Sequence, residues 1–198
     1  FELLGHSSIK ITGDRVIYID PYNINDEPKD ADLIFITHTH YDHFSPEDIQ
    51  KVRNQNTIII VTEDGYTECL KMGFKEHQIN RVVPNKRYQL HGMNFETVPA
   101  YNVKSQYHPK SSNWVGYILE IRSAAYYISG DTDMNEDNVL VECDVAFVPV
   151  GGIYTMDATW DRSEINNDNY KYFLLNNSEQ KDSYNKISSL QKFIINLN

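Results

Sequence analysis

One short stretch of the chain concentrates side chains that bind metals. Thr37-His38-Thr39-His40-Tyr41-Asp42-His43 holds three imidazoles and a carboxylate within six positions, although the chain has only 7 histidines in 198 residues. Imidazole nitrogen together with carboxylate oxygen suits zinc, iron or manganese. The spacing predicts that His38 and His40 face one metal ion while Asp42 and His43 face a second.

The elements on both sides of this motif must position it. The apolar run 33–37 predicts a buried strand directly before the histidines. After them, Ser45-Pro46-Glu47-Asp48 offers an N-cap residue, a proline at the first helical position and acid in the first turn, so a helix is expected to begin there. The motif then lies in a loop, which can aim alternate side chains into one cavity.

The rest of the first 150 residues predicts short strands separated by turns and a few helices. Gly13-Asp14 lies between the apolar runs 8–12 and 15–19, which predicts a hairpin. The run 62–72, which Gly73 closes, predicts a helix. This series favours a layered α/β or α+β architecture. Further strands are expected at 58–61, 88–90, 94–98, 114–121, 125–129 and 145–150.

The sequence changes in character from about Trp160. Residues 161–183 are mostly polar around one apolar patch, Tyr170 to Leu175. Farther on, apolar residues recur at the spacing of one helical face, which predicts a C-terminal amphipathic helix that packs on the core. These residues are Ile187, Leu190, Phe193, Ile194 and Leu197.

Charge and composition restrict the partners of the chain. Lys and Arg number 18 against 28 Asp and Glu, a net charge of -10, which repels phosphate backbones and anionic membrane surfaces. No apolar run reaches the roughly 18 to 20 residues of a membrane span. Cys69 and Cys143 lie too far apart for a zinc knuckle or redox pair, and residues 1–6 carry no secretory signal. We expect a soluble, cytoplasmic protein that binds neither nucleic acid nor membranes.

Several other motifs accompany the histidine motif. They are Leu4-Gly5-His6-Ser7-Ser8, Ile17-Tyr18-Ile19-Asp20-Pro21, Pro99-Ala100-Tyr101-Asn102, His108-Pro109-Lys110, Trp114-Val115-Gly116-Tyr117, Ser129-Gly130-Asp131-Thr132-Asp133 and the stretch 149–158. The order and spacing of these motifs resemble those of the metallo-β-lactamase superfamily over roughly residues 3–158. It is most similar to the metal-dependent hydrolase branch, which looks like the ascorbate-phosphate lactonases and the N-acylphosphatidylethanolamine phospholipase D-like proteins.

The resemblance implies a fold and a domain organisation. Two sheets would pack face to face in a four-layer αββα sandwich, with helices on both outer sides and the metals at one edge between the sheets. Residues 1–158 would form this hydrolase domain. Residues 159–198 would be a divergent C-terminal segment packed on the same domain.

The resemblance also assigns ligands. His38 and His40 would bind the first metal ion, Asp42 and His43 the second, and Asp131 would bridge both from the end of a strand. Many relatives carry the third histidine of the first site where this chain has Tyr101 and Asn102. His108 could fold back to supply it, or could instead face substrate or solvent.

Other residues would support the site. His6 is expected to line the cleft rather than bind metal, and Asp20 to orient the histidine loop by hydrogen bonding. Asn102 and Trp114 would support the site or face the substrate. A small anionic or sugar-like substrate could contact Lys104, Lys110 and Trp114. His77 and His91 belong to no motif and are expected to be exposed.

The implied chemistry is hydrolysis. Two divalent ions, zinc foremost with manganese or iron as alternatives, would lower the pKa of a bound water and polarise a carbonyl or phosphoryl oxygen. The resulting metal-bound hydroxide would attack a small ester, lactone or phosphodiester, with Asp42 holding the water and taking its proton. No cysteine lies near Asp131, which argues against antibiotic hydrolysis.

The end of the chain departs from the family pattern. Relatives continue with a helix, a strand and a final histidine that completes the second site, whereas the last histidine here is His108. A frame change, a splice difference or a natural truncation would explain the difference. One metal ion rather than two is then expected if nothing replaces that ligand. Two other functions stay open: a nucleic-acid phosphodiesterase of the same superfamily, and a catalytically impaired metal-binding protein.

Overall fold

The computed structural model describes residues 1–149, 154–156 and 171–175. Runs rich in Ile, Val, Tyr and Phe form most of the strands because these side chains pack well on a pleated surface. In chain order the elements are β1 (Glu2–Gly5), β2 (Ser8–Thr12), β3 (Val16–Ile19), β4 (Ala31–Phe35), α1 (Pro46–Val52), β5 (Arg53–Thr62), η1 (Glu63–Gly65), α2 (Tyr66–Lys71), η2 (Glu76–Gln78), β6 (Ile79–Val82), β7 (Lys86–Leu90), β8 (Met93–Pro99), η3 (Lys110–Ser112), β9 (Val115–Ile121), β10 (Ala124–Ile128), η4 (Asn138–Leu140), β11 (Val145–Pro149) and β12 (Lys171–Leu175).

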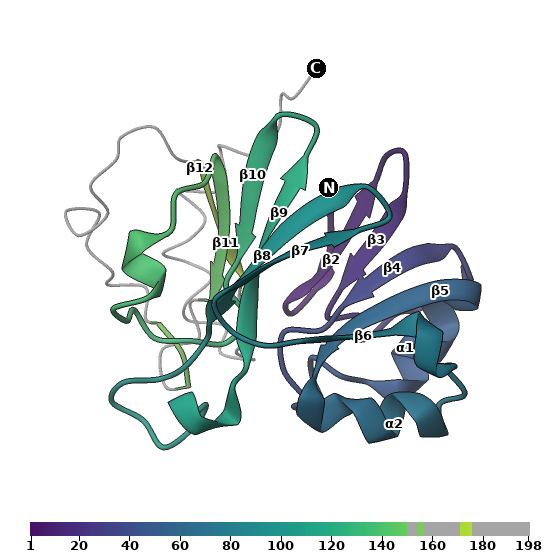
Figure 1. Cartoon of the computed structure of the whole chain (residues 1–198), viewed down its shortest axis with the longest axis horizontal. Helices are drawn as coiled ribbons and strands as arrows, with labels where there is room; N and C mark the ends of the chain where they lie inside the picture. Colours follow the sequence, from purple (N-terminus) through teal and green to yellow (C-terminus); the bar gives the residue numbers. More distant parts are fainter. Residues whose placement is uncertain (150–153, 157–170, 176–198) are drawn as a thin grey trace.

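Within the described residues, these strands form two six-stranded sheets that face each other (Figure 1). The first has the order β1-β2-β3-β4-β5-β6, antiparallel up to β3 and parallel beyond it. The second has the order β12-β11-β10-β9-β8-β7, antiparallel from β7 to β10 and parallel from there to β12. The predicted hairpin is present, since β2 and β3 pair antiparallel with Ile9 opposite Ile19.

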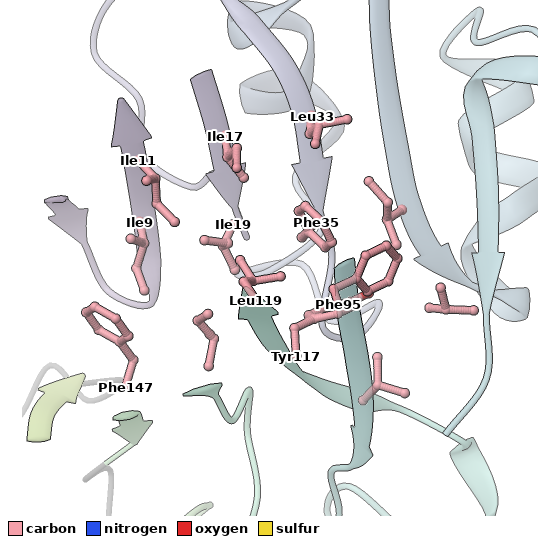
Figure 2. Packing of buried hydrophobic residues seen from close by; sticks show 14 of the residues in the cluster. Ile9, Ile11, Ile17, Ile19, Leu33, Phe35, Phe95, Tyr117, Leu119 and Phe147 are labelled. Carbon is pink, nitrogen blue, oxygen red and sulfur yellow. The ribbon is translucent and has the colours of Figure 1, made fainter. Parts of the chain in front are cut away.

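Alternate residues of both sheets fill the space between them (Figure 2). The ring of Phe35 lies edge-on to those of Phe95 and Tyr117, with centroids 5.2 and 5.1 Å apart. Burial of each large side chain contributes roughly 1.5 to 3 kcal/mol, so this cluster holds the sheets together. The residues that Figure 2 labels are Ile9, Ile11, Ile17, Ile19, Leu33, Phe35, Phe95, Tyr117, Leu119 and Phe147.

The opposite face of the first sheet packs on α1 and α2 (Figure 1). Ile34 and Ile59 from the sheet meet Ile49 and Val52 of α1 in a second buried cluster. On the outer face of the second sheet, Cys143, just after η4, joins a smaller cluster with strand residues. In the described ranges, α-helices therefore cover one side of the sandwich.

Buried hydrogen bonds attach α1 to the loop after β3. Ser45 caps the helix as predicted, because its hydroxyl accepts a hydrogen bond from the backbone N–H of Asp48. The Asp48 carboxylate accepts hydrogen bonds from the backbone N–H groups of Asn23 and Ile24 at 3.0 and 2.9 Å. Lys51 lies 3.1 Å from the same carboxylate. Asp48 thus holds the loop against the helix.

Several boundaries differ from the sequence-based prediction. The 3-10 turn η1 occupies the start of the helix expected over 62–72, where the Thr62 hydroxyl donates a hydrogen bond to Asp64, and α2 begins only at Tyr66. The short strands β1 and β6 were not predicted. The expected helix over 187–197 lies outside the described residues, as does most of segment 159–198 apart from β12, which pairs with β11.

Both cysteines, Cys69 and Cys143, are free thiols and are buried. In the part of the chain that the structure describes, no helix is both long and apolar enough to cross a membrane.

Candidate metal centre

Asp20 holds the start of the histidine loop. It follows β3, next to the end of β4, and is almost completely buried. Its carboxylate accepts hydrogen bonds from the Thr37 backbone N–H at 2.8 Å and from the Thr37 hydroxyl at 2.6 Å. These contacts fix the direction in which the chain leaves β4, and they correspond to the hydrogen bonding expected of Asp20.

The same network orients His38 and His43. Because the Thr37 hydroxyl donates its proton to Asp20, it accepts from Nδ1 of His38, which lies 3.0 Å away. Nδ1 of His43 lies 2.7 Å from Asp20 Oδ2 and donates to it. Both rings therefore present Nε2 to the site. Both Nε2 atoms are buried and make no hydrogen bond with any described residue.

The first cluster consists of His38, His40 and His108, whose donor atoms all lie within 4.8 Å of one another. Nε2 of His108 is 3.1 Å from Nδ1 of His40. His108 reaches this position because its loop folds back: the backbone N–H of Asn102 donates to the His108 carbonyl at 2.8 Å. The Asn102 side chain lies 3.3 Å from Nδ1 of His108.

The second cluster consists of His6, Asp42 and His43, whose donor atoms also lie within 4.8 Å of one another. Nε2 of His6 is 3.0 Å from Oδ2 of Asp42, and Nε2 of His43 is 4.0 Å from the same oxygen. The structure thus brings His6, which was expected only to line the cleft, into contact with a predicted ligand.

Asp131 lies between the two clusters. One of its carboxylate oxygens is 3.4 Å from Nε2 of His43, and the other is 3.5 Å from Nε2 of His108. Gly130 makes this placement possible, since its φ is +63° and a Cβ there would lie only 2.9 Å from that of Thr37. Asp131 therefore lies within 3.5 Å of a histidine from each cluster.

Trp114 forms a wall behind the first cluster. Its ring centroid lies 5.0, 4.6 and 5.6 Å from those of His38, His40 and His108. Its indole N–H donates to Asp64 Oδ2 at 2.8 Å, and the hydroxyl of Thr39 donates to the same oxygen at 2.7 Å.

Asp64 was not predicted from the sequence. The available signal was weak: an Asp-Gly pair at the end of β5, the strand that runs parallel beside β4.

Burial and neighbouring charges set the protonation of the donors. Burial lowers the pKa of His38, His40 and His108, so these rings are neutral near pH 7 and keep a lone pair for a metal. Burial also opposes protonation of His43, but Asp131 and Asp20 raise its pKa well above the ordinary value. Burial alone would raise the pKa of Asp42, yet the hydrogen bond from His6 and the charge of His43 lower it to about 2.

The remaining candidates lie at the border of the site or away from it. Lys110 is exposed, but its ammonium lies 2.9 Å from Glu136 and 3.2 Å from Asp137. Lys104 is exposed, and so are His77 and His91, as expected from the sequence.

These donors fit divalent metal ions. Four imidazoles and two carboxylates from the predicted ligand set converge, and His6 joins them. Nε2 of His38 needs a partner, because an unpaired buried polar atom costs about 1 to 3 kcal/mol; Nε2 of His43 also makes no hydrogen bond, although Asp131 lies 3.4 Å away. A cation held by nitrogen and oxygen donors would satisfy both atoms.

The fold and these clusters define a class of protein. The sequence model of the β-lactamase superfamily domain matches residues 1–161, so the chain belongs to the metallo-β-lactamase superfamily. A UPF0173 metal-dependent hydrolase of Thermoplasma volcanium is 28% identical over 166 residues, which cover 77% of this chain and 71% of that protein.

Solved structures agree. A crystal structure described as a candidate metal-dependent hydrolase from Parabacteroides distasonis is 26% identical, with a TM-score of 0.68 over 87% of this chain and 90% of that one. A metallo-β-lactamase fold protein of Bacillus subtilis has the same TM-score over 94% and 85% of the two chains at 10% identity, which shows the fold alone. The superfamily and fold class predicted from the sequence are confirmed. The likeness to lactonases and phospholipases stays a prediction.

Proposed function

We propose that this protein is a hydrolase that uses two divalent metal ions. His38, His40 and His108 would hold the first ion, Asp42 and His43 the second, and Asp131 would contact both. The observation that carries the proposal is the pair of buried Nε2 atoms, on His38 and His43, that face the converging donors without a hydrogen-bond partner among the described residues. Zinc is the first candidate because the donors are nitrogen and oxygen; manganese and iron accept the same set.

Ions bound there would supply activation of water and polarisation of the scissile group near neutral pH. Asp42 is the proposed catalytic carboxylate. With a pKa of about 2 it stays charged, so it can accept a hydrogen bond from a water molecule and orient it. Asp20 and Thr37 would keep the imidazoles in the required tautomers.

We propose a small ester, lactone or phosphodiester as the substrate. The net charge of -10 disfavours nucleic acid and membranes as partners. Lys110, a candidate for anion binding, is already paired with Glu136 and Asp137. Because of that pairing, binding of an anionic substrate would depend less on Lys110 and more on the positive charge at the metal centre.

The test is the metal content of the purified protein by plasma mass spectrometry, measured together with hydrolysis of an ester, a lactone and a phosphodiester. We expect two ions per chain and turnover of at least one substrate. His40→Ala should lose metal and activity, whereas the matched control His77→Ala, which removes an exposed imidazole, should retain both. Absence of metal after metal-replete purification would overturn the proposal. Stoichiometric metal without turnover would favour the non-catalytic alternative.

A further inference from the structure

The second cluster raises the question of which side chains complete it. Asp42 and His43 are neighbours in the sequence and supply one donor each, and Asp131 is also close to His108 of the first cluster. The first cluster, by contrast, has three histidines of its own. Among the residues that the structure describes, an ion at Asp42 and His43 would therefore have fewer protein ligands unless another side chain contributes.

His6 lies where such a ligand is needed. Its Nε2 is 3.0 Å from Oδ2 of Asp42, the oxygen that Nε2 of His43 also approaches. The rings of His6 and His43 meet edge to face with centroids 5.6 Å apart. Two imidazole nitrogens thus converge on one carboxylate oxygen: one from His43, next to Asp42 in the sequence, and one from His6, 36 positions away.

The turn between β1 and β2 holds His6 in this place. Gly5 has a φ of +129°. His6 has a φ of +52°, a backbone conformation that residues other than glycine rarely adopt. The register of the β1–β2 pair shifts between Leu3 and Gly5. The ring of Tyr22 packs edge-on against His6 at 5.5 Å. Backbone strain of this kind clusters at functional sites, where the surrounding structure maintains it.

We propose that His6 is a ligand of the second metal ion through Nε2, beside Asp42 and His43. The inference rests on the proposed two-metal function. It differs from the expectation that His6 only lines the cleft, and it rests on the donor atoms of His6, Asp42 and His43, which lie within 4.8 Å of one another. The alternative role is positional: His6 would only donate a hydrogen bond to Asp42.

Two substitutions separate these roles. His6→Ala removes both the imidazole and the hydrogen bond. His6→Gln removes the imidazole but keeps an amide N–H that can reach Asp42. His77→Ala is the control, because it removes an exposed imidazole distant in sequence from every motif. Metal-free protein is titrated with zinc against a chromophoric chelator, which gives two dissociation constants, and the absorption spectrum of the cobalt-substituted protein reports the ligand number.

If His6 is a ligand, both His6 variants raise the zinc dissociation constant of the second cluster about tenfold or more and change the cobalt spectrum. The zinc dissociation constant of the first cluster stays within about twofold of the wild-type value. Recovery of wild-type zinc binding in His6→Gln would overturn the inference, as would an unchanged second constant in His6→Ala. A wild-type protein that binds fewer than two ions would instead contradict the proposed function itself.

Discussion

The two donor clusters of this protein share Asp131 but are supported differently. The first, His38, His40 and His108, lies against the ring of Trp114, which Asp64 holds. The second, His6, Asp42 and His43, is open on one side: the His6 and Asp42 side chains are 18% and 21% exposed, whereas that of His43 is fully buried. The Trp114 ring excludes water from one side, so an ion in the first cluster would be shielded on that side, whereas one in the second would be more open to solvent.

In the proposed two-metal function, the difference gives each cluster a separate task. In the first cluster His38 and His108 are buried and His40 is half-buried, and imidazoles held in this way favour tight binding of an ion. Partly exposed donors favour exchange of water and substrate, which hydrolysis requires. The contrast depends on two carboxylates: Asp20 contacts both Thr37 and His43, whereas Asp64 contacts Thr39 and Trp114. Substitution of each carboxylate therefore tests a different part of the comparison.

The largest effect is expected from Asp20→Ala. It leaves the N–H and hydroxyl of Thr37 and Nδ1 of His43 without their acceptor in a fully buried place. Each unpaired buried donor costs about 1 to 3 kcal/mol, so we expect a loss of about 3 kcal/mol or more in the free energy of unfolding. Both zinc dissociation constants should rise, because Asp20 orients His43 directly and His38 through Thr37. Urea unfolding of the metal-free protein and zinc titration measure the two effects.

Asp20→Asn is the matched variant. It keeps the size and one acceptor but turns an amide N–H₂ toward groups that themselves donate, so an intermediate loss is expected. If either Asp20 variant changes only the zinc dissociation constant of the second cluster, Asp20 does not support the first cluster.

A smaller and more local effect is expected from Asp64→Ala. The substitution removes the acceptor of both the Trp114 indole and the Thr39 hydroxyl. Loss of such an outer contact lowers metal affinity by about 10-fold to 100-fold, and we expect this at the first cluster only. Tryptophan fluorescence in a Trp160→Phe background should also change, because Trp114 loses its hydrogen bond.

Asp64→Asn separates charge from geometry. Its amide oxygen can accept from Trp114 and Thr39, while the Thr62 hydroxyl, which now donates to Oδ1, can rotate and accept from the amide. Near-normal affinity is expected. If Asp64→Ala folds and binds both ions as the wild type does, Trp114 is not part of what distinguishes the clusters.

The comparison also shows what the sequence could predict. The sequence indicated His38, His40, Asp42 and His43 as candidate ligands because they lie within six positions after an apolar strand. Asp131 was found because it belongs to a motif that the superfamily shares. Strand positions were predicted well where apolar runs were continuous, as in β4 and β11.

Contacts between distant parts of the chain could not be predicted in this way. Asp64 and Trp114 are 50 positions apart, and His6 and Asp42 are 36 apart. No local sequence pattern reveals either contact, because the contacts form only when the fold brings the end of β5 and the β1–β2 turn to the edge of the sandwich. The missed strand β6 has a related cause, because only its pairing with β5 defines it.

The smallest effect is expected from Asp48→Asn, which lies outside both clusters. Burial opposes ionisation of Asp48, but hydrogen bonds from Ser45, Lys51 and two backbone N–H groups lower its pKa. A lowered folded pKa contributes stability that is complete above the unfolded value of about 3.9 and is lost as the pH falls through the folded value. We expect the variant to be about 1 to 2 kcal/mol less stable near pH 7, with a difference that shrinks in acid.

Urea unfolding at neutral and acid pH measures that difference, and zinc titration of the same variant supplies the control for the comparison. Asp48 and Asp64 both accept hydrogen bonds from a side-chain hydroxyl and from N–H groups, yet only Asp64 contacts the wall behind the histidines. Both zinc constants should therefore be unchanged in Asp48→Asn. A higher zinc dissociation constant in Asp48→Asn would mean that overall stability, rather than the local support of each cluster, determines how tightly the metals bind.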